Sequence, residues 1–145
     1  MAKSLDHVCI LVNDIDDAIE RYKKILGVTA PETLAQKVEK QEQFAGKDRY
    51  LTAVFRPGGD GCNIQLLQPI NPESPLYKRL EKHGEHIHHL GFTSPHLEET
   101  VQKLKESDVA LSSEALVVNA DDPSTRWTWI LPKYAHGALI EVMDG

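Results

Sequence analysis

The stretch that decides the fold is IHHLGFT, residues Ile87–Thr93, because its pattern occurs a second time near the N-terminus. The earlier copy is LDHVCIL, residues Leu5–Leu11, and aligning the two places His7 where the later copy has His89. Both copies are apolar runs in which side chains can alternate with a period of two, which indicates β-strands. A repeated strand with a histidine at the same position predicts two related halves in one chain.

The likeness between the halves continues into the segment after each strand. Asp14–Lys23 aligns with His96–Lys105, with apolar over apolar and acidic over acidic residues at the same spacing. In the first segment this spacing predicts an amphipathic helix that is capped by Asn13 or Asp14 and ends at Gly27. Its apolar positions are Ile15, Ala18, Ile19, Tyr22 and Leu26. A helix with one apolar stripe is expected to cover one face of a sheet.

The remaining segments complete the same series of elements in each half. The first half is expected to contain a loop with one short irregular strand over residues 29–46, strand Tyr50–Phe55, a turn at Arg56–Gly61 and strand Cys62–Leu67. The second half is expected to contain a helix over Leu97–Glu106, weak strands over Val109–Leu111 and Ala115–Val118, a turn over Ala120–Ser124, and strands Arg126–Leu131 and Ala138–Met143. Between the halves, a proline-rich crossing leads into a short helix, Leu76–Lys82, which Ser74 is expected to cap.

These elements predict a mixed α+β fold, in which two tandem βαβββ modules form an open, cup-shaped mixed sheet. We expect one domain over residues 1–145, with module one over about 1–70, a linker and short helix over about 71–85, and module two over about 86–145. Because each helix covers one face of its sheet, the opposite face is left to line a cavity.

The composition excludes several classes of protein. Over 145 residues, 41% hydrophobic and 26% charged residues are typical of a soluble globular domain. The formal charge of -6 argues against a nucleic-acid partner, because binding to phosphates along a duplex needs a basic face. No signal peptide and no bilayer-spanning apolar run are evident, so we expect no membrane partner and a cytoplasmic location. Cys9 and Cys62 lie in apolar runs and are expected to be free thiols.

Four side chains on the strands of the two halves form the candidate site. They are one histidine and one oxygen donor from each half: His7, Gln65, His89 and Glu141. The alternation of side chains along a strand places them on the face opposite a set of apolar residues, namely Ile10, Ile64, Leu90 and Ile140. All four donors are therefore expected to point into one cavity.

Two imidazoles, one carboxylate and one carboxamide form a mixed nitrogen and oxygen site for a divalent ion, with open positions for water or a bidentate substrate. Cobalt, nickel, manganese, zinc and iron all accept such ligands. A single histidine on a strand is more often a hydrogen-bonded structural residue. Here the donors occupy equivalent positions of a repeat, which favours a metal site over that interpretation.

The other five histidines lack this symmetry and are predicted to lie at the surface. His88 has the wrong strand parity, and the rest fall in loops or at helix ends: His83, His86, His96 and His136. Of these, His86 and His136 could lie at the mouth of the cup. Trp127 and Trp129 share one side of their strand and are predicted to belong to the core or the cup wall.

Four segments that together span nearly the whole chain resemble one family. They are LDHV at Leu5–Val8, IQLLQP at Ile64–Pro69 with Glu73–Pro75 after it, GEHIHHL at Gly84–Leu90, and LPK with GALIE at Leu131–Lys133 and Gly137–Glu141. With the βαβββ repeat, they resemble the vicinal oxygen chelate superfamily, which includes glyoxalase I, extradiol dioxygenases and antibiotic-resistance proteins. Within it, the sequence is most similar to methylmalonyl-CoA epimerase. The metal ligands of that family correspond to His7, Gln65, His89 and Glu141.

The resemblance implies a reaction as well as a fold. Epimerases of this family invert the carbon between a carboxylate and a thioester through an enolate that a divalent metal stabilises, while a base and an acid move the proton. They carry a glutamate on the third strand of the first module, where this chain has Thr52, which cannot act as a base near neutral pH. Three explanations stay open: Glu39, Glu42 or Asp48 supplies the carboxylate, Glu141 moves the proton as its equivalent does in glyoxalase I, or the chemistry differs.

The partners that the resemblance implies are small molecules. The expected substrate is methylmalonyl-CoA or a related acyl-CoA thioester, and four residues offer hydrogen bonds or positive charge to a coenzyme A tail: Ser74, Lys78, Arg126 and Lys133. A homodimer is also expected, because exposed sheet edges commonly pair.

Two other functions stay open for such a chain. One is a glyoxalase I-like lactoylglutathione lyase or isomerase that acts on a thiol adduct. The other is a non-catalytic, resistance-type protein that holds a small molecule in the cup, although sequestration alone needs no metal ligands. An extradiol dioxygenase is less favoured, because Gln65 is surplus to its iron site of two histidines and one carboxylate.

Overall fold

The structure is a computed structural model that describes residues 5–112, 116–119 and 122–145. The chain divides into two compact units: unit 1 contains Met1–His7 and His89–Gly145, and unit 2 contains Val8–His88. The order of elements is βαβββ, a helix, and βαβββ again. The predicted α+β class and the predicted repeat are therefore confirmed.

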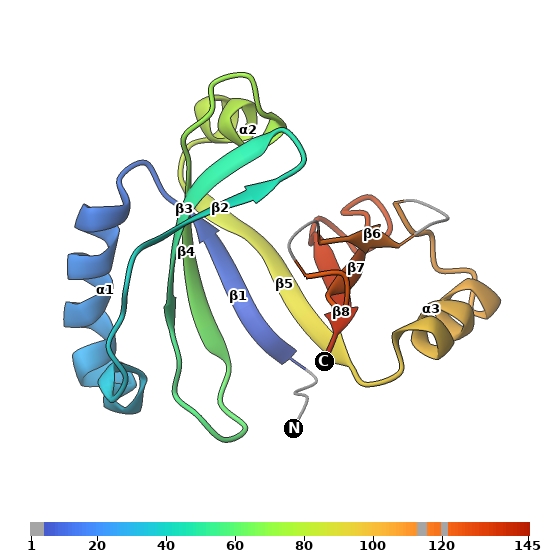
Figure 1. The fold of residues 1–145 in the computed structure, drawn as a ribbon, viewed down its shortest axis with the longest axis horizontal. Coiled ribbons are helices and arrows are strands. Elements are labelled where there is room, and N and C mark those ends of the chain that lie inside the picture. The colour runs from blue at the N-terminus through green and yellow to red at the C-terminus, as the bar shows by residue number, and fades with distance from the viewer. Residues whose placement is uncertain (1–4, 113–115, 120–121) are drawn as a thin grey trace. The chain divides into compact units, whose positions relative to one another are not determined.

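The elements begin and end close to the residues that the sequence patterns predicted. The first repeat comprises β1 (Leu5–Leu11), α1 (Ile15–Thr29), the short 3-10 helix η1 (Pro31–Leu34), β2 (Gln41–Ala45), β3 (Asp48–Phe55) and β4 (Asn63–Pro69). After α2 (Pro75–His83), the second repeat comprises β5 (His86–Ser94), α3 (Leu97–Glu106), β6 (Val117–Val118), β7 (Arg126–Ile130) and β8 (Ile140–Asp144) (Figure 1).

In unit 2, α1 covers one face of a sheet of strands in the order β2-β3-β4-β1 (Figure 1). The Asp14 side chain accepts hydrogen bonds from the backbone N–H groups of Asp16 and Asp17 and so caps the helix, as predicted. The apolar stripe of α1 packs on the sheet in a core that includes Ile15, Ile19, Leu26, Phe55 and Leu66.

Gly27 does not end α1, contrary to the prediction from sequence. The helix continues for two more residues to Thr29, and the backbone N–H of Ala30 closes it on the carbonyl of Leu26. Gly27 has ordinary helical backbone, so it acts as an interior residue of the last turn. A glycine signals a helix end only where the chain needs a positive φ, and none is needed here.

The opposite face of the unit 2 sheet is partly covered by α2. As predicted, Ser74 caps this helix, and its hydroxyl accepts from the backbone N–H of Tyr77. Leu80 of α2 packs against Cys9 and Leu11 of β1, which are both fully buried. The face was expected to stay open along the whole of β1, but its C-terminal half is core under α2.

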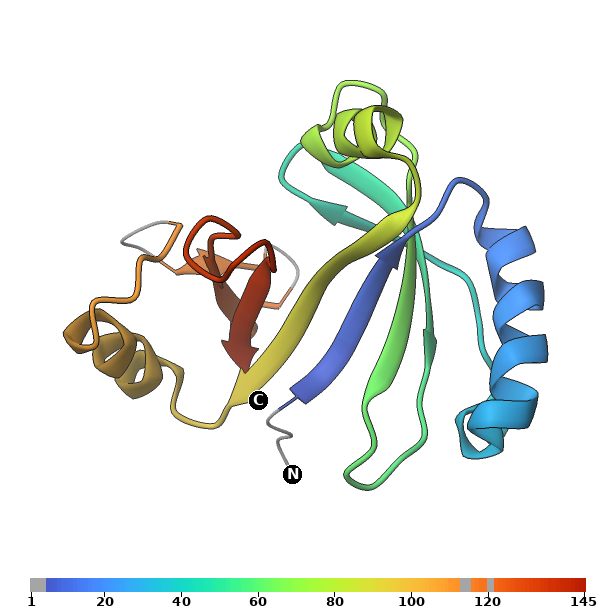
Figure 2. The ribbon, with the colours of Figure 1, turned by 180° about the vertical axis from the view of Figure 1, so that it is seen from behind.

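In unit 1, β5 and β8 run parallel, and β8, β7 and β6 follow in antiparallel order (Figure 2). Leu97 of α3 packs with Ile130 and Val142 to form the core of this unit. The weak strand predicted at Val109–Leu111 is reduced to a single bridge between Leu111 and Ile130. Two other predictions fall partly outside the described residues: Ala115 of the predicted strand Ala115–Val118, and residues 120–121 of the predicted turn Ala120–Ser124.

The parallel β5–β8 pair makes the sheet of unit 1 mixed, as the prediction of a mixed sheet requires. Across the part of the chain that the structure describes, every helix is too short or too polar to cross a membrane.

Candidate metal centre

Three of the four predicted donors meet in unit 1. The Nε2 atoms of His7 and His89 are 3.0 Å apart, and Glu141 Oε1 lies 3.3 Å from the first and 3.9 Å from the second. The side chains come from β1, β5 and β8, and each is at least mostly buried. The sequence repeat therefore identified two histidines and one carboxylate that share one small volume.

The register of the strands places Glu141 within this group. Glu141 on β8 pairs with Gly91 on β5 and, on its other side, with Trp129 on β7. His89 precedes Gly91 by two residues and therefore points to the same side of β5.

The missing side chain of Gly91 makes room for the ring of His7. A Cβ atom at this position would lie 2.1 Å from Cε1 of His7 and 2.5 Å from its Nε2. These distances are far below van der Waals contact, so any side chain at Gly91 would displace the imidazole. Gly91 is required here for space, and its backbone conformation is ordinary.

Asp6 fixes the orientation of His7. Its carboxylate accepts a hydrogen bond from His7 Nδ1 at 2.8 Å. The proton of the neutral ring therefore sits on Nδ1, which leaves the lone pair of Nε2 facing His89 and Glu141. A carboxylate behind a histidine is the usual arrangement of a metal-binding imidazole.

The surroundings of His7 favour positive charge. Burial lowers the pKa of His7, but the hydrogen bond and the charge of Glu141, together with those of Asp6, outweigh it and leave the pKa raised. Two carboxylates thus draw a cation to this point.

Trp129 borders the site on the side of His89. The two rings meet edge to face, with centroids 5.0 Å apart and an angle of 81° between their planes. Trp129 was predicted to be core or cup wall, and the structure places it against a candidate ligand. Its indole limits the rotation of His89 and excludes water from one side of the ring.

Gln65, the fourth predicted donor, lies on β4 in unit 2. Its Nε2 donates a hydrogen bond to the hydroxyl of Thr52 at 3.2 Å, and Thr52 is only 3% exposed. This bond assigns the amide nitrogen to Thr52, so the carbonyl oxygen of Gln65 is the atom left to bind a ligand. The place of Gln65 in the donor set stays a prediction.

Thr52 stands where the family resemblance implies a glutamate, and no predicted substitute reaches its surroundings within unit 2. Glu42 pairs with Leu51 in the β2–β3 register, so its side chain lies on the α1 side of the sheet. It is also ion-paired with Arg49 at 2.6 Å. Glu39 is exposed and paired with Lys37.

Asp48 shares the face of Thr52 but lies four residues along β3, about 13 Å away. Its carboxylate accepts from the backbone N–H of Leu76 at the start of α2. Of the three explanations for Thr52, those that leave Glu141 or a different chemistry to move the proton therefore stay open.

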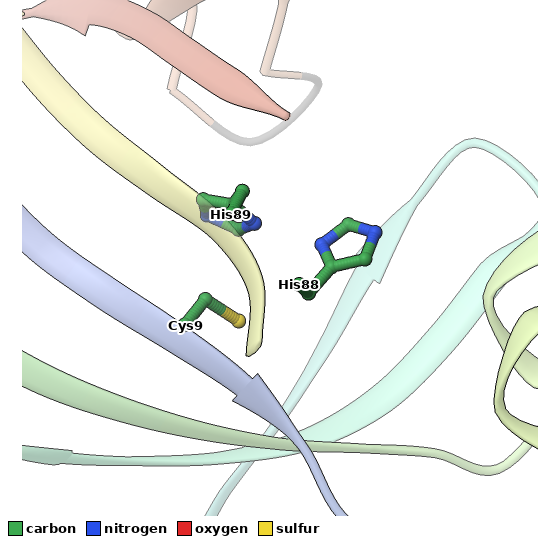
Figure 3. Close-up of side chains that lie close together, drawn as sticks. All are labelled: Cys9, His88 and His89. Carbon is green, nitrogen blue, oxygen red and sulfur yellow. The ribbon is translucent and has the colours of Figure 1, made fainter. Parts of the chain in front are cut away.

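His88 is not a surface residue, contrary to the prediction. Burial, followed by the charges of Arg79 and His86, lowers its pKa to about 4, so it is neutral near pH 7. One of its ring nitrogens lies within 4.8 Å of the thiol of Cys9, and Figure 3 shows both with His89, the next residue of β5. Strand parity indicates the face of a side chain but not how deeply that side chain is buried.

The other residues considered in the sequence analysis are either exposed or bound to neighbouring groups within their own unit. His83, His96 and His136 are exposed, as predicted. Ser74 is fully buried in its capping role, and Arg126 is paired with Asp144 and Glu98. Of the residues suggested for a coenzyme A tail, Lys78 and Lys133 are exposed.

The three clustered donors fit a divalent ion. Ligands that bind one ion at about 2.1 Å lie about 3–3.5 Å apart. Two of the three separations agree with this range, and a small rotation of Glu141 closes the third. Two neutral imidazoles and a carboxylate suit the first-row transition metals predicted from the sequence, which are cobalt, nickel, manganese and zinc.

The sequence analysis did not connect three residues with the metal ligands that they support. Asp6 is adjacent to His7, and a carboxylate beside a candidate ligand is a usable signal for an orienting partner. Gly91 falls on Cys9 when the repeats are aligned, and a glycine in the middle of a strand indicates a close approach. Trp129 could be found only through the register of β7 and β8.

Comparison with known proteins identifies the family. The model of the Glyoxalase/Bleomycin resistance protein/Dioxygenase superfamily matches residues 6–125. The chain is 29% identical over 140 residues to YqjC of Bacillus subtilis, covering 97% of this chain and 91% of that protein. It is 26% identical over 139 residues to mitochondrial methylmalonyl-CoA epimerase of Homo sapiens, covering 95% of this chain and 72% of that protein.

A solved structure agrees with this assignment. The crystal structure of methylmalonyl-CoA epimerase from Mycobacterium tuberculosis has a TM-score of 0.74 and 30% sequence identity, covering 97% of this chain and 87% of that chain. The resemblance inferred from the sequence motifs is thereby confirmed. The chain belongs to the glyoxalase/bleomycin resistance protein/dioxygenase superfamily.

Proposed function

We propose that this chain is a metal-dependent epimerase that acts on methylmalonyl-CoA or a related acyl-CoA thioester. The observation that carries the proposal is the cluster of His7, His89 and Glu141, whose donor atoms lie within 4.8 Å of one another. Similarity to methylmalonyl-CoA epimerases over nearly the whole chain supports the choice of substrate.

In this proposal the chain supplies four donors to one ion. His7 and His89 bind through Nε2, Glu141 through a carboxylate oxygen, and Gln65 through its amide oxygen. Asp6 and Thr52 hold the first and last of these in orientation through the bonds at 2.8 Å and 3.2 Å. When bound, a divalent ion supplies Lewis-acid stabilisation for the negative charge that forms on a thioester when its α-proton leaves.

Glu141 moves the proton in this proposal. Its side chain is largely buried beside two imidazoles, and its second oxygen is available to a substrate held in the same volume. The carboxylate takes the proton from the α-carbon, a water molecule protonates the opposite face of the carbon to complete the inversion, and Glu141 gives its proton to the hydroxide that remains. In unit 2, Thr52 cannot contribute a second base, because its hydroxyl has no suitable pKa.

A second function is favoured by that same threonine. A glyoxalase I-like lyase or isomerase moves a proton between adjacent carbons of a thiol adduct and can use one carboxylate for both steps. With Glu141 as the single acid–base group, the site suits this reaction also. Turnover of the methylglyoxal–glutathione hemithioacetal separates the two functions.

The test is proton exchange in heavy water. Metal-free protein would be incubated with methylmalonyl-CoA in D2O with and without added cobalt, and deuterium at the α-carbon would be followed by mass spectrometry. We expect exchange that requires both protein and metal. Exchange at the uncatalysed rate in the loaded protein, together with turnover of the hemithioacetal, would replace this proposal with the second function.

Three further expectations belong to the same proposal. Residues 1–145 act as one domain, the chain forms a homodimer, and the enzyme works in the cytoplasm. Sedimentation at micromolar concentration checks the second, and a monomeric mass would contradict it.

A further inference from the structure

One face of α2 in unit 2 carries basic side chains that no carboxylate neutralises. Arg79, Lys82 and His83 are spaced by three and four residues, so they project from the same side of the helix. All three are exposed. Within the described ranges, neither Arg79 nor Lys82 forms an ion pair, although the chain has a net charge of -6.

The guanidinium of Arg79 is held in place by a histidine. Arg79 donates from Nε to His86 Nε2 at 3.1 Å, and His86 donates from Nδ1 to the carbonyl oxygen of Gly84 at 2.7 Å. Because a carbonyl can only accept, Nδ1 of His86 carries a proton, and Nε2 is the atom that accepts from Arg79. The chain of bonds fixes the direction of the guanidinium without reducing its charge.

Two other arginines of the chain pair with carboxylates. Arg49 is paired with Glu42 at 2.6 Å, and Arg126 is paired with Asp144 at 3.0 Å and with Glu98. In both residues the guanidinium charge is paired with a neighbouring carboxylate. Arg79 donates to an imidazole instead, and its two terminal amino groups contact no acceptor in the described part of the chain.

Nearby acidic groups do not cancel this charge. Glu85 accepts from the backbone N–H of Asn13 at 2.9 Å and forms no ion pair with Arg79 or Lys82 among the described residues. Glu81 is exposed and lies two residues from Arg79, a spacing that places side chains on different sides of a helix.

An oriented guanidinium with both terminal amino groups available matches the oxygens of a phosphate, which it binds through two parallel hydrogen bonds. Lys82 on the next turn adds a point charge.

We propose that Arg79, oriented by His86 and supported by Lys82, binds a phosphate group of the coenzyme A part of the substrate. The inference rests on the proposed acyl-CoA function, since it names the group that recognises the nucleotide end of that substrate. It assigns recognition to α2, a helix that belongs to neither βαβββ repeat. Arg79 is a binding residue in this assignment and takes no part in proton transfer.

Calorimetric titration tests the proposal without turnover. Free coenzyme A and pantetheine, which lacks the phosphates, would be titrated into the intact wild-type chain, Arg79→Gln and Arg21→Gln. Arg21 is a matched control, because it is exposed on α1 and forms no ion pair among the described residues. We expect Arg79→Gln to weaken coenzyme A binding about tenfold, with pantetheine binding unchanged and Arg21→Gln equal to wild type.

Arg79→Lys sharpens the result, because lysine keeps the charge but loses the bond to His86 and the two-pronged contact. We expect it to bind coenzyme A with intermediate affinity. Equal binding by wild type and Arg79→Gln, or no binding of coenzyme A by wild type, would overturn the inference. A loss of coenzyme A binding in Arg79→Gln without any α-proton exchange in wild type would retain the inference and refute the epimerase instead.

Discussion

The two βαβββ repeats carry an oxygen donor on equivalent strands but surround it differently. In unit 2, Gln65 of β4 lies opposite Val54, and its amide is bonded to Thr52. In unit 1, Glu141 of β8 lies opposite Trp129 and faces two imidazoles. One donor is neutral and tied to a hydroxyl, while the other is charged and left for chemistry.

The difference shows that the arrangement of strands in a repeat does not determine the chemistry of the donor that it carries. Strand order and donor position are the same in both repeats, since these follow from hydrophobic period and strand parity. The immediate neighbours of each donor are not the same, and they decide its role. A carboxylate can exchange a proton near neutral pH, whereas a carboxamide can only coordinate or accept a hydrogen bond.

Exchanging the charged donor for its neutral counterpart should have the largest effect. Glu141→Gln removes the acid–base group and keeps its shape, so we expect α-proton exchange to fall by about 10³-fold or more. The matching change Gln65→Ala in the other repeat removes a neutral ligand and should cost less activity. Exchange measured by mass spectrometry at saturating cobalt decides between them. Greater loss in Gln65→Ala would reverse the roles given to the two repeats.

Glycines provide the next contrast between the units. In Gly91→Ala the new Cβ would overlap His7, so we expect unfolding to become easier by about 1–3 kcal/mol and metal affinity to fall. Gly27 lies inside α1, and in Gly27→Ala the new Cβ meets only Leu34 of η1, at 3.6 Å. We therefore expect the free energy of unfolding to rise by about 0.5–1 kcal/mol. Urea unfolding of both variants measures the pair. A stable Gly91→Ala variant with normal metal affinity would disprove the crowding at His7.

A smaller effect is expected where unit 2 holds its donor. Thr52→Val removes the hydroxyl that fixes the amide of Gln65, which should weaken metal binding by about tenfold with little change in fold. Thr52→Ser keeps the hydroxyl and serves as the control. Cobalt titration followed by absorbance compares them. If valine and serine behave alike, the bond to Thr52 has no part in placing Gln65.

The smallest effect concerns the pH dependence of stability in unit 1. The hydrogen bond from Arg126 lowers the pKa of Asp144 below its ordinary value of 3.8. The stabilisation of the folded state by the Arg126–Asp144 pair is therefore fully present above pH 3.8. It is lost as the pH falls through the lowered pKa of Asp144 in the folded state. Arg126→Leu should lower the free energy of unfolding slightly at pH 7 and reduce the loss of stability that occurs as the pH falls.

Chemical unfolding between about pH 2 and 7 checks this expectation. Arg21→Gln is a suitable control, because Arg21 is exposed on α1 and forms no ion pair among the described residues. If the free energy of unfolding falls equally steeply with decreasing pH in wild type and in Arg126→Leu, the Arg126–Asp144 pair does not stabilise unit 1.

Much of the frame could be predicted because it follows from periodicity. The helix at Leu97–Glu106 was predicted at the residues where it occurs, and Ser74 was predicted as the cap of α2. His7, His89 and Glu141 came from the alignment of the two halves. Each of these inferences needs only the spacing of residues along the chain.

The rest depends on contacts between elements that spacing does not contain. Strand parity could not show that α2 buries Cys9 and gives His88 a lowered pKa. It could not show that Gly91 lies under the ring of His7, which depends on packing between strands. Gly27 misled the prediction because glycine permits a helix end without requiring one.

The central claim is that the two histidines and Glu141 bind one divalent ion. It is tested most directly by cobalt titration of the metal-free wild-type chain, His89→Ala and His96→Ala, in which the last removes an exposed histidine. We predict one bound ion per chain in wild type and in His96→Ala, and an affinity at least about 100-fold lower in His89→Ala. Equal affinity in all three proteins, or no binding by wild type, would contradict the account.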